Sequence, residues 1–151
     1  MTKWIDLPPV WLCLFLVLTW LQATRLPFGG DLGAGALGDL IGGLLVGGGL
    51  VLMVLAFVEM RRAKTTVIPH MTPHALVTTG IFRRTRNPIY LGDALILTGL
   101  AFRWDAWPSL VLVPLFVWVI TDRFILSEEA RLQEQFGASF ERYTEETRRW
   151  V

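Results

Sequence analysis

The chain has 151 residues and is 53% hydrophobic, with a mean hydropathy of +0.49. Soluble domains average about 45–50% apolar residues even with glycine counted, so the composition favours a single integral membrane domain over a soluble one. The formal net charge of +1 gives no support for nucleic-acid binding, and the single cysteine, Cys13, excludes an intrachain disulfide.

Hydropathy predicts four membrane spans, which makes the expected fold an all-α membrane protein. The predicted spans are approximately residues 8–27, 37–58, 89–104 and 107–126. The first run is long, and Asp6 offsets Lys3 before it, so we expect a retained span and not a signal peptide. Trp104 and Trp107 flank a tight turn at an expected aromatic belt, so the third and fourth spans are predicted to form one helical hairpin.

Loop charges set the predicted orientation. The segment 59–88 carries six basic residues against one acid, whereas 28–39 carries two acids and no base. By the positive-inside rule, 59–88 faces the cytoplasm, and an even number of spans places both termini there. The expected setting is a bacterial inner membrane.

The second predicted span is rich in glycine. Gly38 and Gly42 form one small-xxx-small pair, and Gly43 and Gly47 form another. Such pairs let helices approach closely in lipid. We expect them to pack within the bundle, with a homodimer face as the alternative.

Two patterns look like ligand motifs but lack the context that these motifs need. Residues 33–38 read GAGALG, which matches the dinucleotide pattern GxGxxG, yet that fingerprint requires a strand and a helix of a soluble βαβ unit. His70 and His74 have the spacing of ligands on one helix face, but Pro69 and Pro73 disfavour a helix there. We therefore predict neither a nucleotide loop nor a metal site.

The residues after 126 are mostly charged, with apolar side chains at helical spacing. These are Leu132, Phe136, Phe140 and Tyr143. The spacing predicts a cytoplasmic amphipathic helix, divided at Gly137, that lies against the membrane or caps the bundle. Glu128 and Glu129 begin this segment, although the helix dipole disfavours acids at a helix end. A cationic or polyhydroxylated ligand would suit them.

Polar residues stand at both ends of the predicted hairpin, in the segments 74–92 and 128–137. About 35 mostly apolar residues lie between them, enough to cross a bilayer and return, so both segments are expected at the same membrane face. Gly80 and Pro88 indicate turns, and irregular backbone at a membrane is tolerated mainly where it lines a cavity. We expect a functional role for Arg86.

These segments resemble the isoprenylcysteine carboxyl methyltransferase family and its relatives among the membrane phospholipid N-methyltransferases. The family pattern is approximately H-x-L-V-T-[ST]-G-x-[YF], then R-[HN]-P-x-Y-x-G, then E-E-x-x-L-x-x-x-F-G-x-x-[FY]-x-x-Y. The chain matches it at residues 74–82, 86–92 and 128–143, and closes with Arg149-Trp150. The resemblance implies one domain, 1–151, in which 1–58 form two membrane helices and 65–151 form the cofactor-binding catalytic core.

What the resemblance implies is methyl transfer from S-adenosylmethionine at the cytoplasmic interface. The cofactor-binding residues that it implies are His74, Leu76, Val77, Gly80, Arg86, Asn87, Pro88, Tyr90, Glu128 and Glu129. The residues that it implies for catalysis are Arg86, Asn87, Glu129 and Arg149, where Arg149 closes the pocket or steers an anionic head group. Isoprenylcysteine enzymes typically have histidine where this chain has Asn87, whereas asparagine is common among the phospholipid enzymes.

The expected acceptor is a lipidic or prenylated small molecule in the bilayer, and carboxyl O-methylation and lipid N-methylation both remain open. An amine acceptor needs a base, for which His74, Asp93, Glu128 and Glu129 are the candidates. An NADPH-dependent reductase is an alternative, because membrane sterol reductases contain a related R-x-P-x-Y-x-G-[DE] loop. A non-catalytic membrane protein that keeps the fold is the other alternative.

Overall fold

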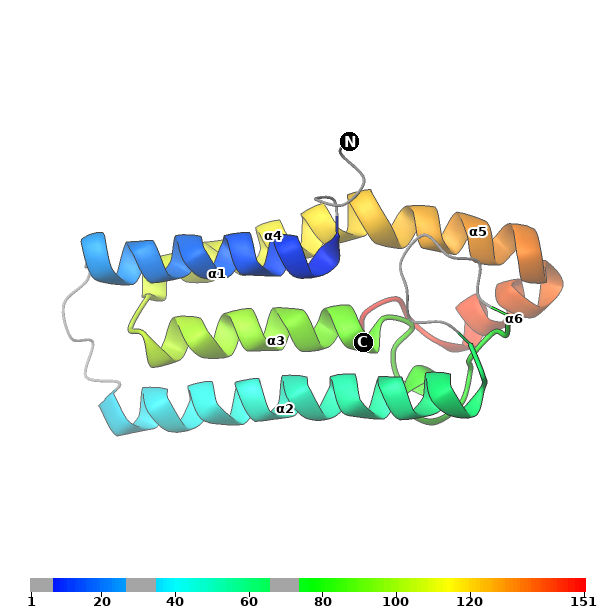
Figure 1. Ribbon diagram of the computed structural model, residues 1–151, viewed down its shortest axis with the longest axis horizontal. Helices are drawn as coiled ribbons and strands as arrows, with labels where there is room; N and C mark the ends of the chain where they lie inside the picture. The colour runs from blue at the N-terminus through cyan, green and yellow to red at the C-terminus, as the bar shows by residue number, and fades with distance from the viewer. Residues whose placement is uncertain (1–6, 27–34, 66–73) are drawn as a thin grey trace.

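The computed structural model describes residues 7–26, 35–65 and 74–151, and every regular element in these residues is helical. Four long helices lie side by side, and each runs antiparallel to the next one along the chain (Figure 1). The first three are α1 (Pro8–Arg25), α2 (Gly35–Arg62) and α3 (Pro88–Arg103). The predicted all-α class is confirmed. His70, Gly33 and most of the 28–39 loop lie outside the described residues.

The fourth long helix, Trp107–Phe136, is continuous and contains several segments of different pitch. They are the 3-10 turn η2 (Trp107–Val111), α4 (Leu112–Ile120), the π turn η3 (Thr121–Ile125) and α5 (Leu126–Phe136). Two shorter elements complete the described fold, the 3-10 turn η1 (Gly80–Arg83) before α3 and α6 (Ala138–Glu146) after α5.

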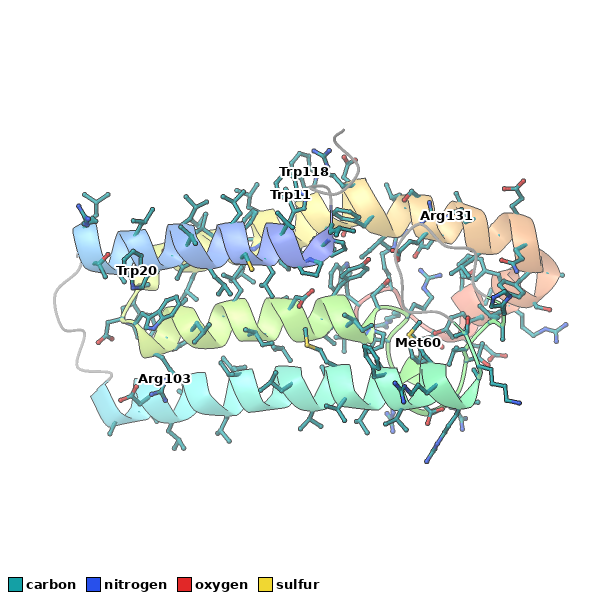
Figure 2. The ribbon with its side chains drawn as sticks, viewed as in Figure 1. Trp11, Trp20, Met60, Arg103, Trp118 and Arg131 are labelled. Carbon is teal, nitrogen blue, oxygen red and sulfur yellow. The ribbon has the colours of Figure 1, made fainter. Side chains whose placement is uncertain are left out.

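Two described helices are long and apolar enough to cross a membrane, α2 with 28 residues and Trp107–Phe136 with 30. Helix α1 has 18 residues and α3 has 16, so the count of four spans stays a prediction. Trp11 and Trp118 lie near one end of α1, and Trp20 lies toward its other end (Figure 2). This distribution is typical of aromatic belts at two membrane interfaces.

Helix α3 lies between α2 on one side and α1 with α4 on the other (Figure 1). On the α2 side, the backbones meet at glycines. A Cβ on Gly49 would lie 2.6 Å from the carbonyl oxygen of Gly92, and a Cβ on Gly42 would lie 2.5 Å from that of Gly99. The contact repeats every seven residues on both helices, so the close approach continues along the helix pair.

The prediction of glycine packing within the bundle is confirmed for the pair Gly38 and Gly42, which are both buried, and is wrong for the pair Gly43 and Gly47. Both residues of this pair are exposed, and no atom of the described residues would lie within 4 Å of a Cβ on Gly47. The reason is that the helices pack at a spacing of seven residues, which selects Gly42 and Gly49. The homodimer face stays a prediction.

The other side of α3 belongs to an apolar core cluster. Tyr90, Ala94 and Leu97 pack there with Phe15 of α1 and with buried side chains of the fourth helix. The Phe15 and Phe116 rings meet edge to face with centroids 5.3 Å apart. Helix α3 is therefore covered on two sides, which places its first turn deep in the molecule.

The fourth helix differs from the sequence prediction, which ended it at 126 and began a separate amphipathic helix. No glycine or proline interrupts residues 115–136, so the helix continues to Phe136. The π turn at Thr121–Ile125 widens it and changes which side of the helix faces α3. The predicted break at Gly137 is confirmed, since this residue has φ +48° and separates α5 from α6.

Helix α6 folds back and covers the end of α2. Phe140 and Tyr143 pack with Phe82 and Ala56, a group that we call the cap cluster. The Tyr143 hydroxyl donates a hydrogen bond to the carbonyl oxygen of Phe82 at 2.7 Å. Burial raises the pKa of Tyr143 above its ordinary value, so the hydroxyl keeps the proton that it donates.

Candidate functional site

Polar residues gather at the end of the bundle where α2 ends and α3 begins. The fourth helix extends beyond its neighbours there, and the C-terminus returns to the start of α3 (Figure 1). Arg86 and Asn87 immediately precede α3, while Glu128 and Glu129 lie in the first turn of α5. The two segments that the sequence placed at one membrane face therefore meet in space.

Glu129 is the centre of an ionic network. Arg149 donates two hydrogen bonds to it, from Nε to Oε1 at 2.9 Å and from Nη2 to Oε2 at 2.7 Å. Arg86 Nη2 lies 3.2 Å from Glu129 Oε1, with side chains only 13% and 18% exposed. Partial burial makes such charge-assisted bonds stronger than those of a surface ion pair. The hydrogen bonds from Arg149 to Glu129 raise the pKa of Arg149 above its ordinary value.

The C-terminal main chain completes this network. Asn87 Nδ2 donates to the carbonyl oxygen of Arg149 at 3.0 Å, and Thr85 Oγ1 donates to the same oxygen at 3.3 Å. The backbone N–H of Arg86 donates to the carbonyl of Arg148 at 3.0 Å. The buried Thr85 and these carbonyls were missed by the sequence analysis, because a main-chain acceptor leaves no mark in the residue pattern.

Tyr90 and Glu128 form a second polar contact beside the first. The Tyr90 hydroxyl donates to Glu128 Oε1 at 2.8 Å, from a side chain that is buried in the core cluster. Pro88 begins α3, where its fixed φ suits the first helical turn and its missing N–H costs nothing. The proline thereby directs Tyr90 from the first turn of α3 toward α5.

The 74–80 segment does not join this network. His74 is exposed, and Leu76 and Val77 pack against the cap cluster. Gly80 lies against Glu59 of α2. The cofactor contacts that were predicted for residues of this segment remain predictions. Leu76 and Val77 already have a structural role, because they pack against apolar side chains of the cap cluster.

Glu59 holds the 74–80 segment against the end of α2. Thr79 Oγ1 donates to Glu59 Oε2 at 2.7 Å, and Arg62 Nη1 lies 3.2 Å from Oε1. Gly80 has φ +57°, and a Cβ there would lie 2.5 Å from Glu59 Cδ, so both conformation and space require glycine. Glu59 was not predicted as a site residue, although its place as the one acid in the basic segment 59–88 was an available signal.

One buried donor in the network has no acceptor. Arg86 Nε forms no hydrogen bond with any of the described residues. Buried donors without a partner are rare in folded proteins, and here the unused N–H belongs to a guanidinium that is paired with the Glu129 carboxylate. A ligand that offers both an acceptor oxygen and donor groups fits this arrangement. Among residues 7–26, 35–65 and 74–151, no group of three His, Cys, Asp or Glu side chains is arranged to hold a metal ion.

Comparison with known proteins gives two matches. A family model described as phospholipid methyltransferase matches residues 38–139. Protein-S-isoprenylcysteine O-methyltransferase of Schizosaccharomyces pombe is 36% identical over 70 residues, which cover 46% of this chain and 30% of that relative. The chain thus matches less than a third of the length of the relative. No solved structure matches the chain.

Proposed function

The chain belongs to the phospholipid methyltransferase family, and on this premise we propose that it is an integral membrane methyltransferase that uses S-adenosylmethionine to methylate a lipidic or prenylated acceptor. The reaction is a carboxyl O-methylation or a lipid N-methylation. The observation that carries the proposal is the network of Arg86, Glu129 and Arg149 at the end of the apolar bundle.

The residues present fit the proposed cofactor. S-adenosylmethionine carries a carboxylate, an amino group and ribose hydroxyls, and it supplies an activated methyl group when bound. The unused Arg86 Nε donor suits the carboxylate or a ribose oxygen. Glu128 and Glu129 suit the amino group or the hydroxyls. Asn87 and Tyr90 lie at the start of α3, where they donate hydrogen bonds to Arg149 and Glu128.

The main task of the chain in this reaction is alignment. Methyl transfer from a sulfonium is an in-line displacement, so holding both reactants in line and excluding water lowers the barrier. The turn before α3 and the first turn of α5 are held together by hydrogen bonds from both sides, which makes the polar side chains rigid. Arg149 closes the network over Glu129 in this proposal.

The same arrangement supports the membrane setting that we propose. The site lies at the end of the bundle that carries the basic residues of 59–88, so we assign it to the cytoplasmic face, with a bacterial inner membrane as the setting. The water-soluble cofactor then arrives from the cytoplasm, and the lipidic acceptor reaches the site laterally from the bilayer.

Calorimetric binding of S-adenosylhomocysteine to the full-length protein in neutral detergent tests this function. We expect the wild type to bind it, and Glu129→Gln to weaken binding at least tenfold because the network loses its charge. Glu134→Gln changes an exposed acid on the same helix α5 and serves as the matched control, with unchanged affinity expected. NADPH is titrated in parallel.

Two results would contradict the proposal. The first is a folded wild type that does not bind S-adenosylhomocysteine. The second is binding of NADPH alone, which would indicate a reductase.

A further inference from the structure

Asp93 is a buried acid that has no partner among the described residues, and it lies next to the proposed site. It is 5% exposed, and none of the described residues gives it a hydrogen bond or an ion pair. Burying an ionised carboxylate without a compensating group is expensive, so such residues usually have a function. Tyr90 and Glu128 form a hydrogen bond with each other, whereas no described residue forms one with Asp93.

The position of Asp93 places it on the membrane side of the site. It follows Tyr90 by three residues on α3, so the two lie on neighbouring parts of one helix face, with Asp93 about 5 Å further along the axis. Asp93 is close enough to the Tyr90 hydroxyl to interact with it electrostatically. Its neighbours along the helix are Gly92, which contacts α2, and Ala94 of the core cluster.

The charged groups near this position are arranged by depth. Glu128 is at the level of the Tyr90 hydroxyl, and Arg131, the basic group that acts on Tyr90, is one turn further along α5, away from the bundle (Figure 2). The groups closest to Asp93 are therefore Tyr90 and the acid Glu128, and the basic Arg131 lies further out. An ammonium is attracted there, whereas a carboxylate is repelled by Asp93 and Glu128.

We propose that Asp93 binds the head group of a long-chain amine acceptor and takes its proton. This inference rests on the proposed function and selects N-methylation within it. The proton passes from the acceptor ammonium to the Asp93 carboxylate, and the nitrogen lone pair becomes free. The nitrogen then forms a bond to the methyl carbon while the carbon–sulfur bond breaks, and the sulfur keeps that electron pair. The products are the methylated ammonium and the neutral thioether.

Binding experiments with defined probes test the proposal. The full-length protein in neutral detergent is titrated with dodecylamine and, separately, with dodecanoate, which has a similar chain but the opposite charge. We expect the wild type to prefer the amine at least tenfold. Asp93→Asn should lose this preference, whereas Asp122→Asn, which changes an exposed acid of the fourth helix, should keep it.

Thermal unfolding separates a binding role from a structural one. Because Asp93 is buried without a partner among the described residues, Asp93→Asn should unfold at the same or a higher temperature than the wild type. A structural role would predict a lower temperature. Asp93→Glu keeps the charge and should keep the preference for the amine.

The outcomes are distinguishable from failure of the proposed function. If S-adenosylhomocysteine does not bind to folded wild type, the methyltransferase proposal fails. S-adenosylhomocysteine should bind equally to the wild type and to Asp93→Asn. If dodecylamine also binds equally to both proteins, the role of Asp93 is overturned. Tighter binding of dodecanoate than of dodecylamine to the wild type overturns it too, without the need for any variant.

Discussion

Glu129 shows how a single side chain can connect distant parts of the chain. It joins α5 to the turn before α3 through Arg86, and to the C-terminal segment through Arg149. From the sequence, we expected a cationic or polyhydroxylated ligand to suit Glu128 and Glu129. In the structure both acids accept hydrogen bonds, Glu128 from Tyr90 and Glu129 from Arg149. Adjacent helical residues can do this because their partners lie on different elements.

Replacing Arg149 should cost stability because its guanidinium binds Glu129 through two bonds. The side chain is 35% exposed, so we expect Arg149→Ala to cost about 1 kcal/mol, or roughly 2–4 °C in the thermal midpoint. Arg148→Ala removes an exposed neighbour and should change little. Equal midpoints for the two variants would contradict the prediction.

The difference in thermal midpoint between Arg149→Ala and Arg148→Ala should not depend on pH between about 7 and 9. Hydrogen bonding to Glu129 raises the pKa of Arg149 in the folded protein above its ordinary value. The stabilisation from a raised pKa is complete below the unfolded value and is lost only as the pH rises through the folded one. Both arginine variants measured at two pH values check this.

Two kinds of contact decide how the helices fit together. Helices α2 and α3 meet through glycine backbones at Gly42, Gly49, Gly92 and Gly99. The fourth helix instead meets α3 through large side chains, and its π turn sets which of its faces does so. Beyond this turn, side chains of α5 reach the start of α3, where Glu128 accepts a hydrogen bond from Tyr90.

Adding a methyl group to α2 should have opposite effects at two nearby glycines. Gly49→Ala places a Cβ 2.6 Å from a backbone oxygen of α3, which must move, so we expect a loss of about 1–3 kcal/mol. Gly47→Ala meets no atom of the described residues within 4 Å and should be neutral or slightly stabilising. Thermal unfolding of both variants in one detergent measures the difference. Equal destabilisation would mean that Gly47 has a contact outside the described residues.

The described part of the molecule is an apolar bundle whose polar contacts gather mainly at one end, which we call the cap end. The cap cluster, the Glu59 contact and the C-terminal segment all lie at this end, beside the basic residues of 59–88. The opposite end has a short turn between Arg103 and Trp107, and an ion pair in which Arg103 Nη2 lies 3.8 Å from Asp39 Oδ1. This asymmetry supports the proposed orientation, in which the cap end faces the cytoplasm.

Cysteine labelling tests this orientation. In a Cys13→Ala background, Ser139→Cys places a thiol on exposed α6 and Pro108→Cys places one at the exposed opposite turn. With intact bacterial cells and a membrane-impermeant thiol reagent, we expect labelling at 108 and none at 139 until the membrane is permeabilised. The reverse pattern would place the proposed site outside the cell.

The sequence alone predicted the helical class, the approximate helix positions, the break at Gly137 and the family. These properties are local, because hydropathy, helix breakers and motif letters are read within a few residues. The meeting of the 74–92 and 128–137 segments also followed, since a hairpin of known length returns its ends to one face.

Only the tertiary structure decided which side chains face each other. The π turn at Thr121–Ile125 changes the helix phase, and helical periodicity in the sequence assumes a constant one. Gly49 packs while Gly47 does not, because the partner helix selects one face. The sequence also could not predict that Asp93 lacks a partner among the described residues, because this depends on the side chains of all the elements that surround it. The carbonyl of Arg149 that holds Asn87 is main chain, and any residue type would supply it.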